Sequence, residues 1–166
     1  PENPLRDLAA RAQATLDIYL PKAGMGRAAQ DAITDRLTWL GDQVSDHLDL
    51  GATALCVSDT HPGNFLMCKD GSARFVDLEK PTYGCPALDL AHTVIDAAAG
   101  WDPDAAMSLS KADRDTFANA WLAAAPAYLA EANAPLIRPF RQAVWLRTIG
   151  FFMRWRVESA VQGPWS

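Results

Sequence analysis

Two stretches of sequence decide the fold: Leu55-Cys-Val-Ser-Asp-Thr-His-Pro-Gly-Asn-Phe-Leu66 and, shortly after it, Phe75-Val-Asp-Leu-Glu79. The first begins as an apolar, partly β-branched segment and ends in a polar run that contains proline and glycine, which predicts a short strand leading into a rigid loop. The polar run carries Asp59 and Asn64, and the second stretch carries Asp77. The chain therefore places carboxylate and carboxamide side chains at close spacing around one predicted loop.

A β-hairpin is predicted between these stretches. Residues 65–68 and 74–78 are short strand candidates, and the turn between them contains Asp70-Gly71, a strong hairpin signal. Pairing of the strands brings the Asn64 end of one beside the Asp77 end of the other. Because Mg²⁺ prefers oxygen ligands and phosphoryl transfer depends mainly on positioning and charge neutralisation, such a group of side chains is typical of phosphotransfer.

The motifs around this hairpin resemble those of the aminoglycoside phosphotransferase and choline kinase family, which shares the protein-kinase fold. The resemblance rests on three runs and covers residues 56–92 closely: SDTHPGNFL at 58–66, RFVDLEKP at 74–81 and YGCPALDLAH at 83–92. It implies an enzyme that transfers the γ-phosphoryl group of ATP to a hydroxyl of a small molecule, with Mg²⁺ as cofactor and ATP as co-substrate.

The same resemblance implies roles for individual residues. Asp59 would be the catalytic base or the group that orients the acceptor hydroxyl, and Asn64 and Asp77 would bind the metal. Asp89 would support the catalytic loop. His61 is expected to be a hydrogen-bonding residue of that loop rather than a ligand.

The sequence departs from the family pattern at three positions. Val57 stands where the family has histidine, Ser58 where it has glycine, and Cys85 where it has aspartate. The family histidine is chiefly a buttress beneath the metal-binding segment. Its replacement therefore bears on the geometry and rate of the site more than on its identity.

Outside the hairpin, apolar spacing and helix-capping patterns predict a helical chain. Helices are expected over residues 5–19, 33–48 (closed by Gly51), 86–99, from Asp102-Pro103, over 110–124 with a capping box at Ser110 and Asp113, and over 135–161. The expected fold is α+β and mainly helical, the C-terminal lobe of a protein-kinase-like fold in which a small β-hairpin carries the site.

Domain organisation follows from what precedes the site. No glycine-rich phosphate loop and no strand with an apolar-flanked lysine is recognisable there. Residues 1–166 are therefore expected to form a single helical, catalytic and substrate-binding lobe, and the N-terminal nucleotide-binding lobe is expected to be absent from this chain. As such a fragment, the chain alone is expected to show little turnover.

Composition and charge limit the kinds of partner that the chain is expected to bind. With 15 basic and 20 acidic residues the net charge is -5, which gives no strong attraction to nucleic acid. The arginines and aromatic residues of the last helix are therefore expected to belong to a core-packing helix.

No apolar run is long enough for a membrane span. The three cysteines lack paired spacing, as in a reduced cytoplasmic protein. We expect small-molecule partners, and neither the acceptor nor the oligomeric state is predicted.

Two other functions stay open. One is a degenerate kinase-like lobe that docks a partner without catalysis, which Val57 and the missing lobe make conceivable. The other is a calcineurin-like metallophosphoesterase, because Ser58-Asp-Thr-His61 after an apolar strand resembles the first metal motif of that family. With three histidines in all, and no motif that would complete the cluster, the sequence favours this reading least.

Overall fold

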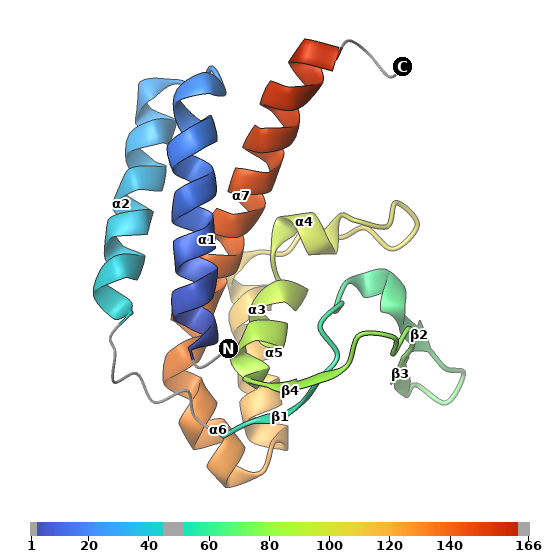
Figure 1. Cartoon of the computed structure of the whole chain (residues 1–166). Coiled ribbons are helices and arrows are strands. Elements are labelled where there is room, and N and C mark those ends of the chain that lie inside the picture. The colour runs from blue at the N-terminus through green and yellow to red at the C-terminus, as the bar shows by residue number, and fades with distance from the viewer. Residues whose placement is uncertain (1–2, 45–51, 163–166) are drawn as a thin grey trace. The chain divides into compact units, whose positions relative to one another are not determined.

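The computed structural model describes residues 3–44 and 52–162, with side chains through residue 159. The described part of the chain is mainly helical with four short strands in its middle (Figure 1). It divides into two compact units, Pro1–Leu48 with Gln142–Ser166 and Asp49–Arg141. The expectation of a mainly helical α+β chain is confirmed.

The first unit begins with α1 (Pro4–Tyr19). The side chain of Asn3 caps the helix by accepting a hydrogen bond from Arg6 N at 2.9 Å, and a proline at the first helical position suits the start of a helix. The apolar residues at three- and four-residue spacing form its buried face: Leu5, Leu8, Ala12 and Leu16. The helix predicted over residues 5–19 is confirmed.

A short 3-10 turn, η1 (Leu20–Lys22), leads to α2 (Arg27–Gln43), which buries Ile33 and Leu40. A helix was predicted over residues 33–48, but α2 ends at Gln43, because the backbone of Val44 is extended and its N–H bonds to Gly41 O in a tightened last turn. The rest of the predicted range, 45–48, lies outside the described residues. The predicted closing residue, Gly51, lies outside the described residues.

The last helix, α7, spans Ile137–Gln162 and contributes its residues from Gln142 onward to the first unit. Gly150 allows α7 to approach α1 closely, since a Cβ there would lie 3.1 Å from Thr15 Cγ2. The predicted core-packing helix is confirmed for one face, which buries Ala143, Leu146 and Met153. Not all aromatic residues of α7 belong to the core, since Phe151, Phe152 and Trp155 are about half exposed.

The second unit contains two separate two-stranded antiparallel sheets. β2 (Phe65–Met67) pairs with β3 (Ala73–Phe75), with Phe65 opposite Phe75, so the predicted hairpin is confirmed. β1 (Ala54–Cys56) pairs with β4 (Thr82–Gly84). The second strand of the hairpin is shorter than predicted and ends before Asp77.

The other elements of the second unit are helices and single 3-10 turns, named here in chain order. They are η2 (Pro62–Asn64), α3 (Pro86–Thr93), α4 (Asp96–Ala99), α5 (Lys111–Ala124), α6 (Ala127–Asn133) and η3 (Ala134–Leu136). The capping box predicted for α5 is present, with Ser110 and Asp113 each bonding the backbone of the other.

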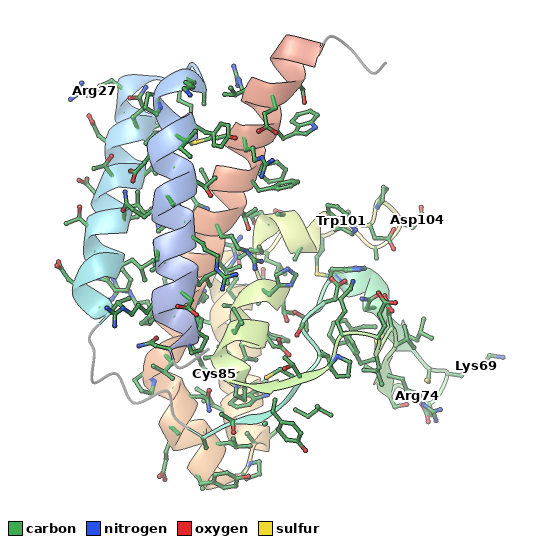
Figure 2. All side chains as sticks on the ribbon, viewed as in Figure 1. Arg27, Lys69, Arg74, Cys85, Trp101 and Asp104 are labelled. Atoms are coloured by element: carbon green, nitrogen blue, oxygen red, sulfur yellow. The ribbon has the colours of Figure 1, made fainter. Side chains whose placement is uncertain are left out.

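Two predictions in this region are corrected. The helix expected over 86–99 is broken, because Ile95 has an extended backbone between α3 and α4. No helix starts at Asp102, whose Oδ1 instead accepts a hydrogen bond from Asp104 N at 3.0 Å and closes a local turn. Figure 2 shows Trp101 and Asp104 on the loop that follows α4.

One buried amide joins three segments of this unit. Asn133, with no exposed surface, accepts hydrogen bonds from Cys85 Sγ and Ala87 N and donates to Ala52 O and Leu129 O. Figure 2 shows Cys85 at the start of α3. The start of α3 is thereby tied to α6 and to the chain that leads into β1.

Candidate functional site

Asp89 holds the loop that follows β1. From the first turn of α3, its Oδ2 accepts a hydrogen bond from Val57 N at 2.7 Å, and its Oδ1 accepts one from Ser58 N at 3.3 Å. Burial raises the pKa of the Asp89 carboxyl, and the two backbone N–H groups oppose that rise. Asp89 therefore lies where a residue that supports the loop must lie.

The loop turns sharply at Ser58. Its φ of 69° lies in the left-handed region, and Asp59 N donates to Val57 O at 2.9 Å across it. A residue other than glycine adopts this conformation at a cost of about 1–3 kcal/mol. The hydrogen bonds to Asp89 offset part of that cost. The glycine of the family pattern at this position would turn here without a steric cost.

Thr60 extends the contact between the loop and α3. Its side chain is buried, and Oγ1 donates to Asp89 O at 3.2 Å and lies 3.3 Å from His92 Nδ1. Since the hydroxyl has a single proton, the bond to His92 requires the hydrogen on Nδ1. Sequence reasoning did not single out Thr60 or His92, although both lie within the quoted motifs.

Asn64 is buried beneath the same loop and is 7% exposed. Its Nδ2 donates to Asp59 O at 2.8 Å, which leaves the amide oxygen as the acceptor of the side chain. Its backbone oxygen accepts a hydrogen bond from Val76 N at 2.9 Å. The hairpin thus brings Asn64 beside the residue that precedes Asp77, as its pairing predicts.

Asp77 follows β3 with its side chain exposed and with a φ of 61°. Aspartate and asparagine tolerate this conformation better than most residues, but it remains uncommon outside glycine. Asp77 therefore lies at a bend of the chain, one residue after Val76, whose N–H donates a hydrogen bond to Asn64 O. The predicted site residues Asp59, Asn64 and Asp77 lie on segments that these backbone bonds connect.

Asp59 forms an ion pair that the sequence did not predict. Its Oδ2 lies 3.3 Å from Lys80 Nζ, and Lys80 Nζ lies 3.2 Å from Glu79 Oε1. Hydrogen bonds that Lys80 donates to Glu79 and Asp59 raise the pKa of Lys80. Glu79 and Lys80 were expected to be ordinary surface charges at the end of a strand. The signal that could have found Lys80 is its position three residues after Asp77.

His61 shows no hydrogen bond at Nδ1, which is buried without a partner among the described residues. The loop-stabilising hydrogen bond expected of His61 is therefore not seen at this atom. The ring instead packs beside Gly63, where an added Cβ would lie 3.1 Å from His61 Cε1 and 2.5 Å from Asp102 Oδ2. Gly63 is needed for the close approach of Asp102 to η2.

The donor atoms fit a metal only in part. Within residues 3–44 and 52–162, no group of three or more histidine, cysteine, aspartate and glutamate side chains is arranged to hold an ion. Asn64 and Asp77 offer one carboxamide and one carboxylate, both hard oxygen donors. Mg²⁺ is commonly held by one or two protein oxygens together with phosphate oxygens and waters. In donor chemistry alone, a carboxamide and a carboxylate suit such an ion.

Asp89 also lines a hollow of about 330 Å³. The other lining residues are mainly apolar and include Cys56, Pro86, Trp121 and Leu129. The hollow does not include Asp59, Asn64 or Asp77.

Among the described helices, none is both long enough and apolar enough to cross a membrane.

Comparison of the chain with models of protein families, with curated proteins and with solved structures found no match. The family resemblance therefore rests on the sequence motifs alone.

Proposed function

We propose that this chain carries the catalytic centre of an ATP-dependent small-molecule kinase of the aminoglycoside phosphotransferase and choline kinase type. In this proposal the chain is the C-terminal lobe of a protein-kinase-like fold. The observation that carries it is the bonding of Asn64 to both neighbouring segments, through Nδ2 to Asp59 O and through its backbone oxygen to Val76 N. These bonds gather the three residues that the motif spacing singled out.

Asp59 receives or orients the proton of the acceptor hydroxyl. Its side chain is 33% exposed, so a small molecule can reach it, while its backbone is held by Asn64 and by the turn at Ser58. A general base must lie within hydrogen-bond reach of the proton that it takes, and a fixed loop provides that position. The acceptor oxygen bonds to the γ-phosphorus, the bond to the bridging oxygen breaks with its electron pair on ADP, and the proton passes to Asp59.

Asn64 and Asp77 would hold Mg²⁺ through the amide oxygen and the carboxylate. When bound, the ion supplies neutralisation of phosphate charge. Asp89 and Thr60 act on the position of the loop and not on the substrate, because their bonds go to Val57 N, Ser58 N and the backbone of α3.

A cytoplasmic location is part of the proposal. Cys56, Cys68 and Cys85 are all free thiols. Burial raises the pKa of Cys56 to about 12, so this thiol stays protonated and unreactive at neutral pH. Free thiols, two of which are buried, suit a reducing compartment.

The test is magnesium-dependent consumption of ATP by the full-length protein over a panel of hydroxyl-bearing acceptors. We expect Asp59→Asn to lower kcat by about 10²- to 10⁴-fold, the range for loss of a positioned acid or base. Asp104→Asn, which changes an exposed aspartate of the loop after α4, is the matched control and should keep the wild-type rate.

Equal inactivity of the wild type and of Asp59→Asn, together with tight binding of a protein partner, would contradict the kinase and support a binding module. Magnesium-dependent hydrolysis of a phosphodiester by the chain alone would support the phosphoesterase instead.

A further inference from the structure

Lys80 places a positive charge directly against the proposed catalytic carboxylate. Its Nζ lies 3.3 Å from Asp59 Oδ2 and 3.2 Å from Glu79 Oε1. Its side chain is 59% exposed, so solvent and small molecules reach the ammonium group. The lysine follows Asp77 by three residues, which puts the cation on the same short segment as the proposed metal ligand.

The ion pair is not what holds the loop in place. The loop after β1 is bonded through its backbone to Asp89 and through Asp59 O to Asn64. An exposed pair of a lysine and a carboxylate contributes little to stability, because both groups are well solvated when apart. The position of Lys80 therefore needs another explanation than the stability of the loop.

Other cations of the hairpin do not serve this position. Figure 2 shows Lys69 and Arg74 on the β2–β3 hairpin, with Lys69 in its turn and Arg74 on β3. Among the described residues, Lys80 is the basic side chain that forms an ion pair with Asp59. Lys80 is thus the basic side chain best placed to meet an anion that approaches Asp59.

We propose that Lys80 is a further catalytic residue that donates a hydrogen bond to an oxygen of the γ-phosphoryl group during its transfer. This inference rests on the proposed kinase function. An ammonium group has three N–H donors, so bonds to Asp59 and Glu79 leave a third for the phosphoryl oxygen. Negative charge is spread over the three equatorial oxygens in the transition state, and a cation held there stabilises it.

The chemistry balances without any change at Lys80. The acceptor oxygen forms its bond to phosphorus, the bond between phosphorus and the bridging oxygen breaks, and its electron pair leaves with ADP. The acceptor proton goes to Asp59, and Lys80 stays an ammonium throughout.

The test compares Lys80→Met and Lys80→Arg with the wild type in the full-length protein. Lys111→Met is the matched control, because Lys111 forms an exposed pair with Asp115 that lies away from the loop in sequence, on α5. We expect Lys80→Met to lower kcat by about 10- to 100-fold, somewhat less than the loss of a buried donor, with a smaller change in the KM of the acceptor. Lys80→Arg should recover part of the rate, and Lys111→Met should match the wild type.

A second measurement does not depend on turnover. Binding of Mg-ADP is compared with binding of Mg-ADP plus aluminium fluoride, which mimics the phosphoryl group in transfer. Lys80→Met should weaken the ternary complex with the mimic while it leaves Mg-ADP affinity unchanged, and unchanged Mg-ADP affinity also shows that the variant is folded.

The outcomes separate the two proposals. If Asp59→Asn is inactive and Lys80→Met keeps the wild-type kcat and the wild-type affinity for the mimic, Lys80 has no catalytic role and the kinase proposal stands. A rise in the KM of the acceptor alone would show that Lys80 binds the acceptor and would overturn the role proposed here. Wild-type protein that consumes no ATP with any acceptor would overturn the kinase proposal and this one with it.

Discussion

At the scale of single residues, the site depends on a few side chains that bond to backbone atoms. Asp89 accepts hydrogen bonds from two consecutive N–H groups of the loop, and Asn64 donates to Asp59 O. Both residues were predicted, because they belong to motifs with recognisable spacing. Lys80 was not predicted to contact Asp59, since a charged residue after a strand is ordinarily solvated and its partner depends on where the chain turns at Asp77.

Asp89 gives a pH-dependent prediction. Burial raises the pKa of its carboxyl above the ordinary value of 3.8, so the folded protein binds this proton more tightly than the unfolded chain does. The stabilising contribution is therefore complete below the unfolded-state pKa and is lost as the pH rises through the folded-state pKa. We expect the free energy of unfolding of the wild type, relative to Asp89→Asn, to fall as the pH rises from 3.8 and to level off above the raised pKa.

Urea unfolding of both proteins at intervals between about pH 4 and pH 7 measures this difference. Asp104→Asn serves as the control for loss of an exposed carboxylate. A stability difference that is constant over this range, or that grows with pH, would show that Asp89 is not destabilised by burial in its charged form.

At the scale of secondary-structure elements, very short strands and turns position the site. The strands have three residues each, so the sheets rely on packing against neighbouring turns and helices. The Asp-Gly turn of the hairpin and the capping box of α5 are local signals, and both were predicted. The break between α3 and α4 was not, because the apolar spacing of residues 86–99 continues across it; the β-branched run Thr93-Val-Ile95, which is less favourable in a helix, is the local signal at the break.

The contact between η2 and the loop after α4 gives a second prediction. A Cβ on Gly63 would lie 2.5 Å from Asp102 Oδ2, and the other oxygen of that carboxylate accepts a hydrogen bond from Asp104 N. Gly63→Ala must therefore displace Asp102, which we expect to cost about 1–3 kcal/mol of unfolding free energy. Adding Asp102→Ala should recover a large part of this loss in a double-mutant cycle measured by urea unfolding.

Gly41→Ala is the control for this substitution. A Cβ at Gly41, within α2, meets no atom within 4 Å, so alanine is expected to stabilise the helix by about 0.5–1 kcal/mol. If Gly63→Ala and Gly41→Ala both proved neutral or stabilising, the close approach of Asp102 to η2 would be absent in solution.

At the scale of the whole molecule, charge gives the third prediction. The chain has 15 basic and 20 acidic residues, and arginines of α7 are paired with carboxylates, Arg141 with Asp115 and Arg154 with Glu158. We expect no saturable binding to a labelled DNA duplex, with anisotropy unchanged up to about 100 μM protein at about 150 mM salt. A basic DNA-binding protein in the same buffer is the positive control. Micromolar binding that weakens steeply with salt would contradict this prediction.

The division of the chain into two compact units was not predicted, because it depends on contacts between distant parts of the sequence. In the first unit, Tyr19 bonds to Glu158 at 2.7 Å and Arg36 bonds to Gln142 at 2.8 Å. These contacts join residues 139 and 106 positions apart. Apolar periodicity shows that a helix has a buried face but not which distant helix covers it.

What the sequence by itself determined is local. Capping residues, apolar spacing and the Asp-Gly turn act within a few residues, so α1, α5, α7 and the β2–β3 hairpin could be predicted with their positions close to those observed. The motif spacing also singled out Asp59, Asn64, Asp77 and Asp89. Only the tertiary structure decided which backbone groups of the loop Asp89 bonds and that Lys80 lies against Asp59. Such contacts depend on how separate segments pack, and no short-range pattern of residues encodes that geometry.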